Sequence, residues 1–506
     1  MSRPSRFLIP VILLAAVTHL FSTDAPKPLA LVASGSPRIL PARILGASIA
    51  PFFEHLLANT QKQDILKTLH LAFTRFPGGS DANYYDWRKG VPVVNASPNS
   101  STYTKYWATV APKIARGFPD GVTYEAYKPF NDAIGADVIF VPNLETSTIE
   151  EQIAWFKHLK ELNIVPSHIE LGNEFYIAMV MDPNVLKRWP NAETSMKIMR
   201  EYCEALRPYL PNDAKIAVQA SPGSFDLGDD EHNRYAERLR SWDDSLKPET
   251  WFDAVTIHLY PRLNTVTGRA DVLSEHPSPS TSPALFKALM AHADEGVDTV
   301  IDALEKRLPG KQIWVTEWSP RGASVIAKEK IDPVTPPMLL HLCTRTALAL
   351  LRHDTVTVSL YFMFTFGTTF NSYVPVGHGN FAPLPVPVAL GWLNEAANGG
   401  AAFQRMTEQN ASRIDGANAK HERYYEIEGG LFTAAEKTTL IIDNASAKNR
   451  ILDLTSLRDG KVPETVEIVS AGALWEYEKK AATVSAVTSS LHIDLPAYSV
   501  ARCIWK

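Results

Sequence analysis

Eight short apolar runs, separated by stretches with helical periodicity, constrain the fold of this chain more than any other feature. Several of the runs are apolar without interruption, which is typical of strands buried on both faces of a sheet. They lie at residues 44–49, 71–76, 137–142, 168–171, 215–220, 253–259, 312–316 and 356–364. Strands that alternate with helices form parallel sheets, because each helix returns the chain to the start of the next strand.

The segments between the runs carry helix signals. Thr148 and Glu151 form a capping box before one helical pattern, and another pattern stops at Pro309 and Gly310. Eight strands with intervening helices predict a (β/α)8 TIM barrel over residues 41–400. A doubly wound open sheet is the alternative. It needs no eighth strand, and no glycine-rich fingerprint follows the first strand.

The pattern changes after residue 400. Helical periodicity stops, and short apolar runs separated by polar turns follow, as in a small β-sandwich. We therefore assign residues 401–506 to a C-terminal β-sandwich domain. Within residues 26–40, the apolar segment 29–34 is a candidate for an added strand of that sandwich. The expected fold class is α/β, a barrel followed by a sandwich.

Composition and charge exclude some classes of partner. The 506 residues are 45% hydrophobic and 21% charged, and the formal net charge is −5 at pH 7. These values are ordinary for a globular protein. There is no cluster of basic residues of the kind that binds phosphates, so no nucleic-acid partner is expected. The sequence gives no indication of an oligomeric state.

The N-terminal segment has the features of a signal peptide. Arg3 and Arg6 precede an apolar run from Phe7 to Phe21. That run is short for a membrane span, which needs about 20 apolar residues. We interpret residues 1–25 as a signal peptide, with an uncleaved anchor as the alternative. A secreted or extracytoplasmic protein is expected, with no membrane association after the signal is cleaved.

Two glutamates follow strands in a similar way. IELGNEFY, Ile169 to Tyr176, places Glu174 after the fourth predicted strand, and IWVTEWSP, Ile313 to Pro320, places Glu317 after the seventh. The C-terminal ends of barrel strands open onto one face, where active sites are built. Both carboxylates should therefore face one pocket. Cleavage of a glycosidic bond needs two such groups, one protonated to release the leaving oxygen and one ionised.

Other polar and aromatic residues at strand ends fit the same chemistry. The Asn173 amide is placed to donate to a sugar hydroxyl, and a Tyr260 hydroxyl bond would keep a carboxylate ionised. The further candidates for substrate binding are His258, Asn143, Trp318, Tyr361 and Arg75. The aromatic members offer faces for stacking on a sugar. For Asn143 an Asx turn, and for Arg75 a structural ion pair, are the alternatives.

These motifs resemble those of the retaining glycosidases of clan A. GNE after strand four, H-x-Y after strand six and T-E-W after strand seven carry the resemblance. It implies that Glu174 is the acid/base, that Glu317 is the nucleophile, and that substrates are poly- or oligosaccharides. Within the clan, RFPGGSDANYYDW (75–87) is similar to a loop of family 51 α-L-arabinofuranosidases. The layout and GNE equally resemble family 79, the heparanase-like β-glucuronidases, for which Arg262 is a candidate carboxylate ligand.

No metal site and no cofactor is expected. The sequence has no H-E-x-x-H, C-x-x-C or acidic calcium loop. A serine hydrolase is not favoured, because no G-x-S-x-G occurs. The alternative from another functional class is a barrel that binds carbohydrate without cutting it. The presence of both glutamates argues against that alternative.

Overall fold

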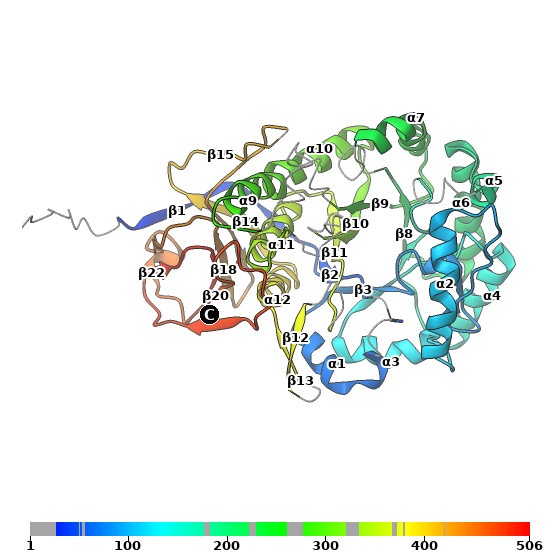
Figure 1. Cartoon of the computed structure of the whole chain (residues 1–506), viewed down its shortest axis with the longest axis horizontal. Coiled ribbons are helices and arrows are strands. Elements are labelled where there is room, and N and C mark those ends of the chain that lie inside the picture. Colours follow the sequence, from blue (N-terminus) through cyan, green and yellow to red (C-terminus); the bar gives the residue numbers. More distant parts are fainter. Residues whose placement is uncertain are drawn as a thin grey trace, which may run out of the picture.

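A computed structural model describes residues 27–49, 51–52, 56–176, 183–221, 229–260, 277–319, 333–366, 372–377, 380–418 and 420–506. The predicted signal segment up to residue 25 and Arg262 lie outside these ranges. Two large sheets organise the chain, one of eight parallel strands and one of nine strands. They form a barrel and a sandwich (Figure 1), so the predicted fold class is confirmed.

The eight-stranded sheet uses all eight predicted runs. Its order is β2-β11-β10-β9-β8-β7-β6-β3, with every neighbouring pair parallel. The strands are β2 (Leu45–Ala47), β3 (Phe73–Phe76), β6 (Asp137–Phe140), β7 (His168–Glu170), β8 (Lys215–Gln219), β9 (Ala254–Leu259), β10 (Gln312–Trp318) and β11 (Val356–Tyr361).

The two ends of this sheet meet between β2 and β3. Ala72 N donates to Leu45 O at 2.8 Å. Gly46 lies against the backbone of Phe73, and a Cβ at position 46 would overlap the Phe73 carbonyl oxygen. Glycine is therefore needed where the backbones approach most closely. This closure distinguishes the barrel from the open-sheet alternative.

Helices surround the barrel. They are α1 (Thr60–Lys67), α2 (Thr102–Gly117), α3 (Tyr124–Ile134), α4 (Ile149–Glu161), α5 (Pro183–Arg188), α6 (Ala192–Leu206), α7 (Asp229–Leu246), α9 (Ser282–Ala291), α10 (Val297–Arg307), α11 (Pro336–Leu350) and α12 (Pro385–Ala397). A π-helical turn, His292–Gly296, joins α9 to α10. Thr148 caps α4 as predicted, with its side chain accepting from Glu151 N. Among the described helices, none is both long and apolar enough to cross a membrane.

Short strands and single helical turns lie in the connecting segments. Three two-stranded sheets pair β4 (Tyr85–Asp86) with β5 (Val91–Pro92), β12 (Tyr373–Gly377) with β13 (Asn380–Pro383), and β15 (Ile414–Asp415) with β16 (Arg423–Tyr424). Single turns of 3-10 helix occur at Leu56–Ala58, Ala82–Tyr84, Arg207–Tyr209 and Arg458–Gly460.

The sandwich is built from both ends of the chain. Its strand order is β21-β20-β23-β18-β17-β14-β1-β19-β22. The strands are β1 (Leu29–Ile39), β14 (Ala402–Glu408), β17 (Ile427–Thr433), β18 (Thr438–Asn444), β19 (Arg450–Asp453), β20 (Thr465–Ser470), β21 (Thr483–Ala486), β22 (His492–Leu495) and β23 (Ser499–Trp505). β1 is antiparallel to β14 and parallel to β19, so the segment before the barrel lies within this sheet.

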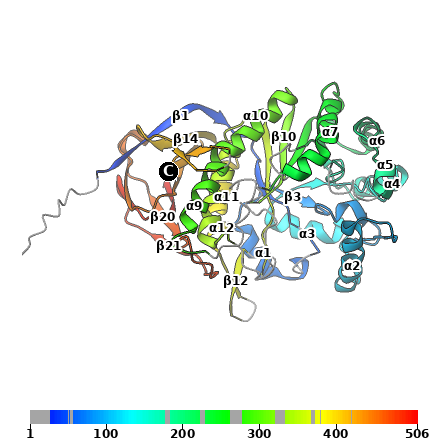
Figure 2. The same ribbon diagram turned by 45° about the horizontal axis from the view of Figure 1, so that its top comes forward.

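The barrel and the sandwich share a core. Helices α9, α11 and α12 lie between the barrel strands and the sandwich in both views (Figures 1 and 2). Leu348 of α11 belongs to the same buried apolar cluster as Phe403, Phe432 and Ile441 of the sandwich strands. The apolar surface of one domain is therefore covered by the other.

Buried charges also cross this interface. Arg345 Nη1 lies 2.7 Å from Glu428, and Arg352 Nη1 lies 2.9 Å from Glu428 and 2.6 Å from Asp294. Arg405 Nη2 lies 2.9 Å from the same Asp294. Burial acts to raise the pKa of Glu428, but the charges of the three arginines outweigh it and hold that pKa well below its usual range. Removing either partner of such a pair would leave an uncompensated buried charge.

Candidate active site

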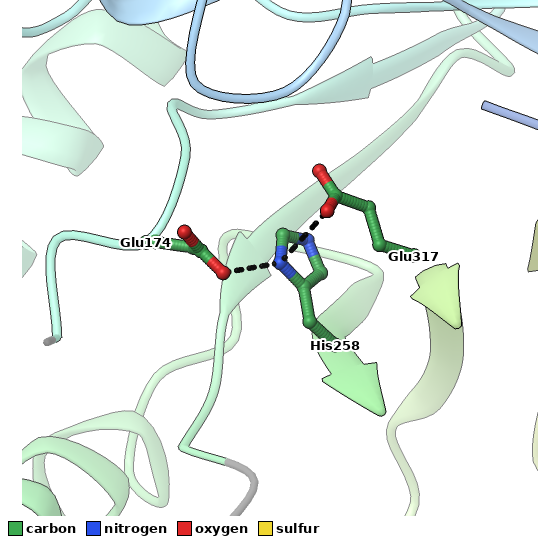
Figure 3. Close-up of side chains that lie close together, drawn as sticks. All are labelled: Glu174, His258 and Glu317. Atoms are coloured by element: carbon green, nitrogen blue, oxygen red, sulfur yellow. Dashed lines mark hydrogen bonds and ion pairs between the residues drawn. The ribbon is translucent and has the colours of Figure 1, made fainter. Parts of the chain in front are cut away.

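Glu174 and Glu317 meet on the same face of the barrel, on either side of His258 (Figure 3). His258 Nδ1 lies 2.8 Å from Glu174 Oε1 and 3.7 Å from Glu317 Oε2. An oxygen of each carboxylate and the imidazole nitrogen all lie within 4.8 Å of one another. The two carboxylates predicted from distant strand ends are thus brought together.

The GNE turn gives Glu174 its direction. Glu174 has φ 55°, in the left-handed region that a side chain adopts at a cost. Gly172 before it has φ 78°, and a Cβ there would overlap the Phe175 ring. Gln219 of β8 then fixes the turn, since its Oε1 accepts from Phe175 N at 2.6 Å and its Nε2 donates to Leu171 O at 3.0 Å. The glycine and the glutamine together hold the carboxylate at the strand end.

A β-bulge in β10 aims Glu317. The pairing of β10 with β9 shifts between Val315 and Glu317, leaving Thr316 without its own partner. Trp314 and Thr316 face the barrel interior, so strict alternation would turn Glu317 outward. The bulge reverses this, because the extra residue moves Glu317 inward and Trp318 outward. Trp318 accordingly packs in the core shared with the helices.

Glu317 is held as a carboxylate. Arg75 donates to its Oε1, and the Tyr260 hydroxyl donates to its Oε2. Burial acts to raise the pKa of Glu317, but the charges of His258 and Arg75, with the bonds from Tyr260 and Arg75, bring that pKa below its usual value. Both oxygens are therefore oriented while the charge is retained, as a nucleophile requires.

A second buried glutamate positions Arg75. Glu170 of β7 accepts from Arg75 Nε at 2.8 Å and from Arg75 Nη2 at 2.9 Å, and Thr316 Oγ1 donates to it at 3.1 Å. Both Arg75 and Glu170 are fully buried. Burial acts to lower the pKa of Arg75, but the charges of Glu170 and Glu317 raise it overall. Sequence reasoning missed Glu170, although a charge inside the apolar run at 168–171 was a signal.

Asn173 joins the same network. Its Oδ1 accepts from Arg75 Nη2 at 2.9 Å, and its backbone oxygen accepts from Asn83 Nδ2 at 2.9 Å. Its buried Nδ2 has no hydrogen-bond partner among the described residues. A donor left unsatisfied beside Glu174 is available to a substrate hydroxyl, which fits the role predicted for this amide.

The PGG turn after β3 lies directly beside Glu317. A Cβ on Gly79 would overlap Glu317 Oε1 and approach Arg75 Nη1 to 3.2 Å, and a Cβ on Gly78 would meet the Asp81 carboxylate. Asp81 is 4% exposed, and burial raises its pKa to about 7. The two glycines therefore let the backbone pass between two carboxyl groups.

Gly79→Ala is expected to spare folding and to lower turnover. The new methyl group must push the Glu317 carboxylate away from Arg75, because that carboxylate is the end of a movable side chain. Misplacement of a reacting group by about 1 Å costs roughly 10²-fold in rate. The measurement is kcat together with the melting temperature. Gly117→Ala is the control, since a Cβ there meets nothing within 4 Å. Unchanged kcat in Gly79→Ala would show that the turn does not restrain Glu317.

Three predicted substrate-binding residues lie elsewhere. Trp318 is 2% exposed and its Nε1 donates to Ser359 Oγ at 2.9 Å, so the predicted stacking role of Trp318 is contradicted by its outward packing. Tyr361 packs against that indole at 5.3 Å between ring centroids. Asn143 forms an Asx turn, with its Oδ1 accepting from Glu145 N and Thr146 N. The amide of Asn143 thus builds its own loop, which was the alternative reading.

The ligand atoms of Glu174, His258 and Glu317 are close enough to hold a metal ion. Their other contacts fit a cation less well. Arg75 already places a fixed positive charge on Glu317, and Tyr260 donates to the remaining oxygen. A bound cation would have to displace these donors and lie beside a guanidinium. The donor set is better suited to moving protons than to holding a divalent ion.

Comparison with solved structures shows which proteins have a similar fold. No protein-family model matches the chain, and no curated protein matches its sequence. A family 51 α-L-arabinofuranosidase from Bifidobacterium longum superposes with a TM-score of 0.69 at 12% identity, covering 95% of this chain and 100% of that one. The family 51 arabinofuranosidase from Xanthomonas axonopodis pv. citri gives 0.63 at 13%, covering 95% and 100%. A family 44 xyloglucanase from Paenibacillus polymyxa gives 0.59 at 10%, covering 94% and 99%.

What these proteins share with this chain is the fold. All three are glycoside hydrolases of clan A, so the resemblance inferred from the motifs is confirmed at the level of architecture. Identities of 10–13% establish the barrel with its sandwich and no more. The chemistry has to be argued from the residues at the strand ends.

Proposed function

We propose that the protein is a retaining glycoside hydrolase that cleaves O-glycosidic bonds in poly- or oligosaccharides by double displacement. The observation that carries the proposal is the pair Glu174 and Glu317, facing each other with different partners. Glu317 is bonded to two donors that keep it ionised, whereas Glu174 is bonded to an imidazole that can exchange a proton with it. Retaining pairs lie about 5–5.5 Å apart, and oxygens within 4.8 Å fit that spacing.

The reaction would take two steps. Glu317 attacks the anomeric carbon while Glu174 gives a proton to the departing oxygen, so that the glycosidic bond breaks and a glycosyl ester forms. Water, deprotonated by Glu174, then attacks the same carbon and releases Glu317. As Glu317 loses its charge in the ester, Arg75 remains paired with Glu170. Arg75 therefore keeps a carboxylate partner at every stage of the reaction.

The pH dependence of kcat/KM should reflect the protonation of Glu317 and His258. Burial acts to lower the pKa of His258, but the Glu317 charge and the bond to Glu174 raise it to about 8. Below that pH His258 carries a proton beside Glu174, and above it His258 loses that proton. We expect activity to fall as pH rises through about 8, and to persist on the acid side to below about 4.3, the ordinary value for Glu. A His258→Gln variant that keeps the same alkaline limb would contradict this.

The sugar favoured is an α-L-arabinofuranoside, with a β-glucuronide as the alternative. The RFPGGSDANYYDW loop and the two arabinofuranosidases of the same fold support the first choice. Purified protein assayed on 4-nitrophenyl α-L-arabinofuranoside, β-D-glucuronide, β-D-glucoside and β-D-xyloside tests it. Turnover of the arabinofuranoside well above the others is expected. Turnover of the glucuronide alone would select the heparanase-like assignment.

A carbohydrate-binding barrel without activity is the remaining alternative. It would bind sugars equally well with and without Glu317, and would turn over no member of that panel. The paired donors on Glu317 disfavour it, because an ionised buried carboxylate costs free energy that binding alone does not require.

We also propose that the protein is exported. The support is the sequence alone: two arginines before the apolar run from Phe7 to Phe21. N-terminal sequencing of native protein from the extracytoplasmic fraction should begin after about residue 22. Recovery of the protein in the cytosol with Met1 intact would contradict export.

A further inference from the structure

Asp81 is a buried carboxyl group beside the site that the proposed reaction does not use. It precedes the 3-10 turn Ala82–Tyr84 in the loop after β3, and its side chain makes no capping bond to that turn. It is 4% exposed, and its Oδ2 has no hydrogen-bond partner among the described residues. A buried carboxylate in such surroundings is costly, so a carboxyl group placed there favours its neutral form.

The two glycines before Asp81 place it close to the nucleophile. A Cβ on Gly78 would lie 2.5 and 2.6 Å from the two Asp81 oxygens. A Cβ on Gly79 would overlap Glu317 Oε1 and lie 3.2 Å from Arg75 Nη1. The two carboxyl groups thus contact neighbouring residues of one turn, whose Cα atoms are about 3.8 Å apart. At such short range in a buried site, the charge of one group affects the ionisation of the other.

The charges of Arg75 and Glu317 act on Asp81 in opposite directions. Burial raises the pKa of Asp81 to about 7; the Arg75 charge acts to lower it, and the Glu317 charge adds to the rise. The other titratable groups beside this loop are Tyr85 and Tyr103, the second through a bond to Ser80. Burial holds the pKa of both phenols well above the ordinary value, so they stay neutral. The ionisation of Asp81 therefore depends on whether Glu317 is charged.

The proposed reaction changes the charge of Glu317. In the first step an oxygen of Glu317 becomes bonded to the anomeric carbon, and its negative charge is lost in the ester. The repulsion that favours a neutral Asp81 then disappears, while the attraction of Arg75 remains. Release of the Asp81 proton to the solvent restores the lost negative charge beside Arg75. When water hydrolyses the ester, Glu317 regains its charge and Asp81 takes a proton back.

We propose that Asp81 is a positioning residue for Arg75, neutral while Glu317 is a carboxylate and ionised while Glu317 is a glycosyl ester. The inference rests on the proposed glycosidase function and adds a regulated charge to the same site. Together with Glu170, Asp81 would keep two negative charges around Arg75 in the second step, as in the free protein. The proton released in one step is recovered in the next, so no further reactant is consumed.

The link between Glu317 and Asp81 can be measured without turnover. Glu317→Gln gives position 317 the neutral charge of the ester at nearly the same shape. Infrared spectra of the full-length protein follow the carbonyl stretch of protonated carboxylic acids across pH, and the component absent from Asp81→Asn belongs to Asp81. We expect its midpoint at about pH 7 in the wild type and at lower pH in Glu317→Gln. Asp243 is the internal control: burial raises its pKa to about 6, its ion-pair partner is Arg307, and its midpoint should not move.

Kinetics separate a positioning role from a merely structural one. On the acid side of pH 7, Asp81→Asn should leave the first step intact, because both side chains are neutral and similar in shape. The second step should slow, because asparagine cannot supply the charge. On an aryl glycoside whose leaving group departs readily, kcat should fall about tenfold, the effect of about one pKa unit, while kcat/KM, which reports the first step, stays the same. Asp64→Asn, at a 69% exposed side chain on α1, is the control and should change neither.

Two results would overturn the proposal. One is an Asp81 midpoint that stays at about pH 7 in Glu317→Gln. The other is a kcat that does not fall in Asp81→Asn, or that falls only in proportion to kcat/KM. Asp81→Ser, which also lacks the carboxyl group, takes the place of Asp81→Asn in both measurements if the asparagine variant does not fold. Failure of the glycosidase proposal would appear separately, as the absence of turnover on every aryl glycoside while the infrared midpoint still moves.

Discussion

Glu317→Gly should abolish hydrolysis, and sodium azide should restore part of it with a product of inverted configuration. The substitution removes the attacking carboxylate and leaves a space beside Arg75 that a small anion can enter. Loss of a nucleophile costs at least about 10⁴-fold in kcat. Azide attacking directly, with Glu174 still available as the acid, would form a glycosyl azide in one displacement. The assay is release of the aryl alcohol with and without azide, and NMR of the azide product.

Glu170→Gln provides the matched control. Glu170 is also a fully buried carboxylate bonded to Arg75, and among the described residues its other side-chain donor is Thr316. We expect azide to form no inverted glycosyl azide with Glu170→Gln, because the attacking carboxylate of Glu317 is still present. Turnover near that of the wild type in Glu317→Gly would exclude Glu317 as the nucleophile.

Deletion of residues 401–506 should give insoluble or inactive protein. The cut would expose the apolar faces of α11 and α12 that now pack on the sandwich. It would also leave Arg345 and Arg352 without Glu428, and β1 without β14. Breaking one buried pair costs about 3–5 kcal/mol, and a whole domain is stable by only about 5–15 kcal/mol. The soluble fraction after expression and the activity of any soluble barrel measure the effect.

The full-length variant Glu428→Gln separates the contribution of the buried ion pairs to stability from the contribution of the apolar contacts. It keeps the sandwich in place and removes only the carboxylate shared by three arginines, so we expect a folded protein with a lowered melting temperature. A barrel of residues 27–400 that stays soluble and retains full turnover on an aryl glycoside would show instead that the two domains are independent.

The barrel could be predicted because its strands are buried on both faces. Such strands appear in the sequence as apolar runs, and all eight runs coincide with barrel strands. The two glutamates could be found for a related reason. Parallel strands end on one face, so polar residues at the C-terminal ends of β7 and β10 must share a pocket. The roles of Arg75, Tyr260 and His258 as neighbours of Glu317 follow from the same topology.

Other features depend on geometry that a local pattern does not encode. The bulge at Thr316 exchanges the directions of Glu317 and Trp318, and a strict period of two would have turned Glu317 away from the site. Trp318, which was a candidate for sugar stacking, therefore packs away from the site. Glu170 acts through Arg75, 95 positions away in the sequence.

The anomeric configuration of the first product tests the central claim most directly. Hydrolysis of an aryl glycoside that the enzyme turns over is followed by ¹H NMR during the first minutes, before the sugar mutarotates. Double displacement through Glu317 and Glu174 inverts the anomeric carbon twice, so the first product should have the configuration of the substrate. A first product of opposite configuration would mean a single displacement by water and would contradict the assignment of Glu317 as nucleophile.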